Sequence, residues 1–184
     1  MDGEWCDSCE DLMSRYCDEA SVREKLHRAS YYKFSCRNKF FQLPIIICSA
    51  VSGSIQLLSK QFPDVEGAII TGTAALSIFT SILGSLHAYL KYGTQMGAHE
   101  TAEVSWQSFH NKIKHCLNLR RDLRPDPQEF IAQIHTAYER LFEISPILDQ
   151  TIINQIKKAI KNASDNEFRV PNYLNGLTHT QPFA

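Results

Sequence analysis

Two long uncharged runs dominate the pattern of hydrophobic and polar positions along the chain. The first covers residues 40–59 and the second covers residues 67–90, and neither contains Asp, Glu, Lys or Arg. A helix needs roughly 20 mainly apolar residues to cross the ~30 Å hydrocarbon core of a bilayer. Each run therefore predicts a transmembrane helix.

A hairpin is the simplest arrangement of these two runs. Only the short segment from Lys60 to Glu66 separates them, so the two helices are predicted to lie side by side and antiparallel. The alternative is a helical hairpin buried in a soluble core. The rest of the chain offers too few apolar helices to cover such a hairpin on every side. Residues 40–90 are therefore interpreted as a transmembrane hairpin.

Shorter patterns predict helices on both sides of the hairpin. Ser21-Val22-Arg23-Glu24 matches a capping box, which predicts the start of a basic juxtamembrane helix over residues 21–39. Asp126-Pro127 and Ser145-Pro146 have the features of two further helix starts. The apolar positions with helical spacing after the second run are Ala102, Trp106, Phe109, Ile113, Cys116, Phe130, Ile134, Tyr138, Leu141, Ile144, Leu148, Ile152, Ile156 and Ile160.

The predicted fold class is an all-α membrane protein, with a two-span hairpin and a flanking cytosolic helical bundle. Residues 1–20 form an N-terminal cysteine-containing segment in this interpretation, and residues 91–162 form the bundle. Residues 163–184 contain Pro, Gly and several Asn and are predicted to form an extended tail. The acidic N-terminus has no signal-peptide pattern, so we expect the spans themselves to direct insertion.

The charge distribution predicts the orientation of the hairpin. Basic residues lie before the first run and after the second, whereas the loop contains only Lys60. The positive-inside rule then places both termini in the cytosol. The net charge is −1, so no overall basic field indicates nucleic-acid binding. The predicted membrane-interface residues are Tyr31, Tyr32, Lys33, Arg37, Lys39, Phe40, Phe41, Tyr89, Lys91 and Tyr92.

Small and polar residues recur at helical spacing inside both runs. They are Ser49, Ser52, Gly53, Gln56, Thr73, Ser77, Ser81, Gly84 and Ser85. Such residues let helices approach closely in lipid, so we predict that they form the contact between the two spans. A ring of hairpins that lines a polar pore with these faces is the alternative. Proton relays and ion-coupled transport are not favoured, because the runs contain no carboxylate, Lys or Arg.

The cysteine-containing segment is the one candidate for chemistry. Trp5-Cys6-Asp7-Ser8-Cys9 contains a CxxC pattern but lacks the preceding strand of a thioredoxin-type redox motif. Cys6, Cys9 and Cys17 are weak candidates for a metal site, and a disulfide or redox role also stays open beside ordinary reduced thiols. No H-E-x-x-H, phosphate-binding loop or nucleophile elbow occurs. We therefore expect neither an enzyme nor a cofactor.

One set of features extends over most of the chain: Tyr31-Tyr32-Lys33, Arg37 to Pro44, Ser49 to Gly53, the second span with Tyr92, and the helix from Trp106 to Arg124. With these features, the residues from Tyr31 to Asn162 resemble a family of two-span membrane proteins of large DNA viruses, including iridoviruses. They are also similar to bacterial SLATT-type two-transmembrane domains. The resemblance rests on the aromatic and basic run into the proline-containing first span, on the short loop, and on the helix from Trp106 to Arg124. The viral family implies a virion or infection-stage membrane protein. The bacterial domains imply a pore-forming membrane effector.

These observations predict a structural membrane protein of a large DNA virus particle, which anchors the capsid shell to the internal membrane. The expected partners are the lipid bilayer, capsid or minor capsid proteins and a second copy of the chain. The expected location is the virion internal membrane or a host membrane derived from the endoplasmic reticulum. A channel-like oligomer is the main alternative, and a host-membrane remodeller is a weaker one. Predicted partner-binding residues of the tail are Pro171, Tyr173, Leu174, Pro182 and Phe183.

Overall fold

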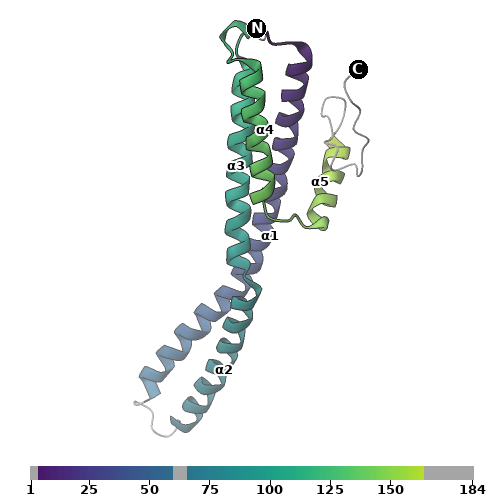
Figure 1. Cartoon of the computed structure of the whole chain (residues 1–184). Coiled ribbons are helices and arrows are strands. Elements are labelled where there is room, and N and C mark those ends of the chain that lie inside the picture. The colour runs from purple at the N-terminus through teal and green to yellow at the C-terminus, as the bar shows by residue number, and fades with distance from the viewer. Residues whose placement is uncertain (1–3, 60–65, 164–184) are drawn as a thin grey trace. The chain divides into compact units, whose positions relative to one another are not determined.

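The described part of the chain, residues 4–59 and 66–163 of a computed structural model, contains only helices as regular elements. This confirms the all-helical prediction. The loop residues 60–65 and the predicted tail residues 164–184 lie outside the described residues. The elements in chain order are α1 (Asp7–Ser59), α2 (Glu66–Leu90), α3 (Tyr92–Asn118), the short 3-10 helix η2 (Arg121–Leu123), α4 (Pro127–Ile144) and α5 (Gln150–Ala163), as Figure 1 shows.

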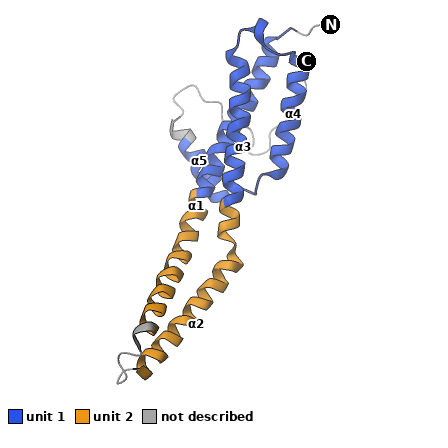
Figure 2. Cartoon of the chain, turned by 90° about the vertical axis from the view of Figure 1, so that its left-hand side faces the viewer, with its two compact units in different colours: residues 1–31, 97–184 blue, residues 32–96 orange. Residues whose placement is uncertain are grey.

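The chain divides into two compact units. Unit 1 consists of Met1–Tyr31 and Gly97–Ala184, and unit 2 consists of Tyr32–Met96 (Figure 2). The helix α1 contributes its first half to unit 1 and its second half to unit 2. Unit 1 therefore joins two stretches that are far apart in the sequence, whereas unit 2 is one continuous stretch.

The main core of unit 1 lies between α1, α3 and α4. The side chains of Met13, Trp106, Ile113 and Ile134 are fully buried there. The heptad pattern of α3 is confirmed, since Ala102, Trp106, Phe109, Ile113 and Cys116 are all buried. Aromatic contacts strengthen this core, with the rings of Trp106 and Tyr138 5.7 Å apart.

A smaller apolar cluster fixes α5 against α1. Val22, Leu26 and Ile152 are buried in it, and Leu148 and Ile156 pack at its edge. The apolar stripe predicted for this last helix is therefore used for packing. The side chain of Ile160 lies outside the described residues.

Two predicted helix starts are corrected by the structure. The first helix begins at Asp7 rather than at the capping box at Ser21, because residues 7–20 carry apolar side chains that pack into the unit 1 core. Residues 7–20 are therefore part of α1 and not a separate segment. The last helix begins at Gln150 rather than at Ser145, because Ser145 ends α4 and the Asp149 carboxylate accepts the Thr151 N–H at 2.8 Å.

The predicted start of α4 is confirmed in detail. The Asp126 carboxylate accepts a hydrogen bond from the Glu129 backbone N–H at 2.9 Å, and Pro127 occupies the first turn. An N-cap carboxylate of this kind satisfies one of the free N–H groups at the helix start. The local sequence at Asp126-Pro127 therefore predicts the start of α4 correctly.

Candidate membrane-embedding surface

Unit 2 exposes its large apolar side chains. On α1, Phe40 is 74% exposed and Ile47 is 59% exposed, and on α2, Ile78 is 64% exposed. The residues of unit 2 that are buried in the described part are Ser35, Ser52 and Thr73, all with hydroxyl side chains. The other large apolar residues exposed along both helices are Leu43, Ile46, Val51, Ile70, Phe79, Ile82 and Leu86. A surface of this composition is unfavourable in water and favourable in lipid.

One helical stretch of the described chain is long and apolar enough to cross a membrane. It lies in the run 66–118, which comprises α2 and α3, and its apolar segment has a mean hydropathy of 1.7 with 6% of its residues buried. The apolar half of α1 does not meet the same criterion within the described residues. By length and composition, one helical stretch is thus compatible with a crossing, and the crossing by residues 40–59 stays a prediction.

Several hydroxyl groups of unit 2 donate to backbone carbonyls of their own helix. The Ser77 hydroxyl donates to the Thr73 carbonyl at 2.8 Å, and the Ser81 hydroxyl donates to the Ser77 carbonyl at 2.8 Å. Thr71 and Ser54 make the same contact four residues back, each at 2.9 Å. A hydroxyl that already donates to a carbonyl of its own helix has a small free-energy cost of transfer from water to lipid. These helices can therefore carry serines on a lipid-facing side.

The predicted packing residues fall into two groups. Ser52 and Thr73 are buried and Gly84 is half-buried, so these three lie toward the inside of unit 2. A side chain at Gly84 would meet no other atom within 4 Å, so close approach does not require glycine there. The remaining six, which are exposed, are Ser49, Gly53, Gln56, Ser77, Ser81 and Ser85.

The exposed serines of α2 form one face of that helix. Ser77, Ser81 and Ser85 line a shallow open groove together with Ile78 and Ile82. The structure therefore does not bring this part of the small-residue pattern into the contact between α1 and α2. Half-buried side chains on the two helices include those of Phe41, Ile45, Cys48, Ile55, Leu76, Thr80 and Leu83.

A polar and aromatic cluster joins α1 to α2 and α3 within unit 2. The His87 Nε2 and the Asn38 Oδ1 are 2.7 Å apart, which indicates that the ring donates to the amide oxygen. The Tyr92 ring lies 5.8 Å from the Phe41 ring, and the Arg37 guanidinium lies 5.9 Å from the Tyr92 centroid. The sequence interpretation missed the bond between Asn38 and His87. The signal was present, since both are polar residues near the ends of apolar runs.

The predicted interface residues lie around this cluster and differ in exposure. Tyr32 is 65% exposed and Tyr89 is 81% exposed, which suits amphipathic rings at a membrane boundary. Tyr31, Lys33, Phe41 and Tyr92 are half-buried, and Arg37, Lys39, Phe40 and Lys91 are exposed.

Lys91 has a positive φ of 50° between α2 and α3. Its carbonyl accepts the Gln95 N–H at 3.1 Å and so starts α3. A left-handed residue with a side chain costs roughly 1–2 kcal/mol. Lys91 therefore marks the end of α2, the exposed apolar helix, and the start of α3, which contributes to the unit 1 core.

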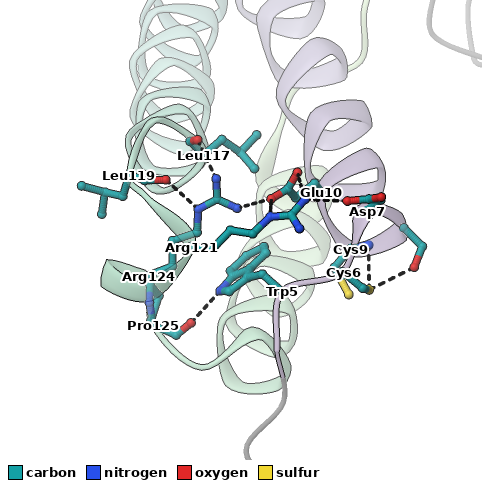
Figure 3. A network of polar contacts seen from close by, with 11 residues as sticks. Trp5, Cys6, Asp7, Cys9, Glu10, Leu117, Leu119, Arg121, Arg124 and Pro125 are labelled. Carbon is teal, nitrogen blue, oxygen red and sulfur yellow. Dashed lines mark hydrogen bonds and ion pairs between the residues drawn. The ribbon is translucent and has the colours of Figure 1, made fainter.

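Unit 1 contains a network that we call the N-terminal clasp, formed by Trp5, Asp7, Glu10, Arg121 and Arg124 (Figure 3). The Arg124 guanidinium contacts the Glu10 carboxylate at 2.5 Å and donates to the carbonyls of Leu119 and Leu117 at the end of α3. Arg121 contacts Glu10 at 2.8 Å and Asp7 at 2.5 Å. These hydrogen bonds from Arg121 and then from Arg124 lower the pKa of Glu10 to about 2.

Trp5 completes the clasp on its apolar side. Its indole N–H donates to the Pro125 carbonyl at 2.9 Å, and its ring lies 5.9 Å from that of Phe130. The Arg124 guanidinium lies 5.1 Å from the Trp5 ring centroid. The start of α1 is therefore fixed against the segment between α3 and α4.

Two histidines form a buried pair between α1 and α3 in unit 1. The Nδ1 atoms of His27 and His99 are 3.0 Å apart, and both side chains are fully buried. The Nε2 of His27 is buried without a hydrogen-bond partner among the described residues. Burial, then the charges of His99 and Arg23, lower the pKa of His27 to about 4, and burial also lowers the pKa of His99. The sequence interpretation did not pair these residues.

Of the three weak metal candidates, Cys17 is not brought together with Cys6 and Cys9. Cys17 lies eight residues after Cys9 on the same helix, which is roughly 12 Å along the axis at 1.5 Å per residue. Its sulfur lies 3.3 Å from the His110 Nδ1, and burial raises its pKa. Within the described residues, no group of three or more His, Cys, Asp or Glu is placed to hold a metal ion.

No protein-family model matches the chain, and no significant match occurs among curated proteins or solved structures. The fold therefore defines the class on its own. Over residues 4–59 and 66–163, the chain is an all-helical protein that combines a packed helical unit with one helix long and apolar enough to cross a membrane.

Proposed function

We propose that the chain is a two-span membrane anchor of a large DNA virus particle. The hairpin of residues 40–90 is embedded in the bilayer, and the bundle and tail bind capsid proteins. The observation that carries the anchor is the reversed burial of unit 2, which exposes isoleucines and phenylalanines and buries hydroxyl residues. The viral setting rests on the resemblance of residues 31–162 to two-span proteins of such viruses.

Unit 1 has features that suit a protein-binding part. It has its own apolar core and a clasp of interhelical ion pairs, so its packing does not need lipid. Near the end of α4 it exposes Phe142, Ile144 and Ile147, the last at 95%. Apolar side chains exposed close together are typical of surfaces that bind other proteins. We therefore assign capsid attachment to this unit together with the tail.

The pore-forming oligomer is the second candidate function. It is favoured by the exposed face of Ser77, Ser81 and Ser85, which has no partner within the described part of unit 2. The anchor ranks first because the hydroxyls of Ser77 and Ser81 already bond to carbonyls of their own helix. Such a face does not need a water-filled lumen to satisfy its polar groups.

Fractionation of particles tests the anchor. The full chain should remain in the membrane pellet after alkaline carbonate extraction and should crosslink to capsid protein before detergent treatment. A variant that lacks the residues after Asn166 should keep its helix content and membrane insertion but be lost from particles. Normal incorporation of this truncated chain would assign attachment to the bundle alone. A full chain that is released by carbonate would contradict the anchor itself.

Orientation has its own test in microsomes. A glycosylation acceptor inserted near Pro63 should be modified, because the loop is expected on the lumenal side. The native sequon at Asn162 should stay unmodified in the same sample, which makes it the internal control. Modification at Asn162 would contradict the proposed orientation.

A further inference from the structure

Two cysteines flank the first residues of α1 outside the proposed membrane surface. Cys6 directly precedes the helix, and its carbonyl accepts the Glu10 N–H at 3.1 Å. The Cys6 sulfur accepts the Cys9 N–H at 3.3 Å. Cys6 thus takes the place of an N-cap residue, with sulfur in the role that a Ser or Asp oxygen usually has. Figure 3 shows both cysteines beside the clasp.

The spacing of these cysteines suits a disulfide. Side chains three residues apart in a helical turn have Cβ atoms about 5–6 Å apart, and a disulfide needs Cα atoms at roughly 4.4–6.8 Å and somewhat closer Cβ atoms. Only a small adjustment of the turn is therefore needed. The clasp fixes Trp5, Asp7 and Glu10 on both sides of the pair, so the two sulfurs are held near one another.

The two thiols differ in environment. Cys6 is exposed, whereas Cys9 is half-buried. Hydrogen bonds from Cys9 and from the Ser8 hydroxyl, 3.0 Å from the sulfur, lower the pKa of Cys6 to about 7. The contact with Cys6 raises the pKa of Cys9. An exposed thiolate beside a protonated, partly covered thiol is the arrangement in which the first attacks and the second resolves.

We propose that Cys6 and Cys9 form a redox-active dithiol whose substrate is a disulfide. The Cys6 thiolate attacks one sulfur of the substrate, the substrate S–S bond breaks, and one substrate thiolate leaves. Cys9 then loses its proton to solvent and attacks the Cys6 sulfur of the mixed disulfide, which releases the second substrate thiolate. The dithiol is oxidised by two electrons to an intramolecular disulfide, and the substrate disulfide is reduced to two thiols.

Three of the other four described cysteines provide the comparison. Cys17 is half-buried against His110 and Cys116 is buried, and burial raises the pKa of both thiols. Cys36 is exposed but has no second cysteine within the next turn of helix. It is therefore the matched control for exposure without a resolving thiol.

The test uses the full chain in detergent micelles, with glutathione disulfide or a disulfide-containing protein as the oxidant. Mass spectrometry after alkylation should find a reversible bond between Cys6 and Cys9. Cys9→Ser should accumulate a mixed disulfide at Cys6, whereas Cys6→Ser should prevent the reaction and Cys36→Ser should leave it unchanged. Reaction with both oxidants supports a general dithiol, and reaction with the protein alone supports the dithiol with protein disulfides as its substrate.

Alkylation rates give a second measurement. A thiol with a pKa near 7 should react at pH 7 about fivefold faster than an ordinary exposed thiol, because its larger thiolate fraction outweighs its lower nucleophilicity. Cys6 should therefore react faster than Cys36. Equal rates at the two sites, failure of the bond between Cys6 and Cys9 to form, or tight zinc binding that Cys6→Ser abolishes would each overturn the proposal.

Discussion

The two units of this chain bury opposite kinds of side chain. Unit 1 buries Met13, Trp106 and Ile134, and unit 2 buries Ser52 and Thr73 while it exposes its isoleucines. The hydrophobic effect explains the first arrangement, because apolar surface leaves water when the helices pack. The hydrophobic effect does not explain the exposed isoleucines of unit 2 if that unit is surrounded by water. The proposed anchor accounts for this difference, because in that proposal water surrounds unit 1 and lipid surrounds unit 2.

The units also satisfy polar groups differently. In unit 1, charged side chains pair between helices, as Arg28 does with Glu103 at 2.6 Å. In unit 2, hydroxyls bond to carbonyls of their own helix, as Thr80 does with Leu76 at 3.0 Å. Bonds inside one helix survive in lipid whatever the helix packs against. Unit 1 thus depends on tertiary contacts that substitutions can break.

The largest effect is expected for Trp106→Ala. Trp106 is fully buried, and its indole N–H donates to the Ser145 hydroxyl at 2.9 Å. The substitution should lower the free energy of unfolding of unit 1 by about 3–5 kcal/mol. Urea denaturation of the full chain in micelles, followed by near-ultraviolet circular dichroism, measures it. Val104→Ala, exposed on the same helix, should change stability by less than about 0.5 kcal/mol. Equal effects of the two variants would contradict the core assignment.

A smaller effect is expected from acidification. The pKa of His27 is about 4 in the folded protein, below its ordinary value of 6.5, so the unfolded chain binds more protons between these values. Stability should therefore fall as pH decreases through this window. From pH 7.5 to pH 5 the loss should be on the order of 2 kcal/mol.

Denaturation at several pH values checks this. The double variant His27→Leu, His99→Leu should flatten the profile, because both partners of the contact are removed together. His115→Gln, exposed on α3, should leave it unchanged. The folded-state pKa of Glu10, about 2, keeps the clasp carboxylate ionised over this range. Stability that stays constant or rises on acidification would contradict the role of the histidine pair.

Local patterns predicted the parts of the fold that depend on local physics. The apolar runs, the heptad of α3 and the Asp126 cap each involve residues within a few turns of one another. The start of α1 was missed because its first residues are stabilised by packing on α3 and α4, which a capping box does not reveal. Hydrophobic periodicity thus gave the helices, while tertiary contacts decided where some of them begin.

The clasp and the histidine pair could not be predicted for the same reason. Arg121 and Glu10 are 111 residues apart in sequence, and His27 and His99 are 72 apart. In sequence, Arg121 and Arg124 counted only as positive charges after the second span. The structure shows both paired with the Glu10 carboxylate, which offsets their charge. We therefore expect the basic residues closest to the hairpin to determine its orientation.

The smallest effect is expected for Ser77→Leu combined with Ser81→Leu. Both serines are exposed and bonded to their own helix, so the anchor predicts unchanged membrane insertion and no selective ion flux in liposomes before or after the change. Ser52→Leu, which is buried in unit 2, is the contrasting variant and should disturb the packing of α1 on α2. Flux that the double substitution abolishes, with insertion intact, would favour the pore.

The central claim, that unit 2 is solvated by lipid and unit 1 by water, is tested most directly by two matched lysine substitutions. Ile78 in α2 and Val104 in α3 are exposed to similar extents, 64% and 59%. A lysine at the centre of a membrane helix costs about 2.5–3.5 kcal/mol, whereas one on a water-exposed helix costs less than about 0.5 kcal/mol. The measurement is the carbonate-resistant fraction of each variant after translation into microsomes. We expect Ile78→Lys combined with Ile47→Lys, one lysine in each predicted span, to leave the membrane fraction while Val104→Lys remains in it. Equal retention of the two variants would contradict the claim.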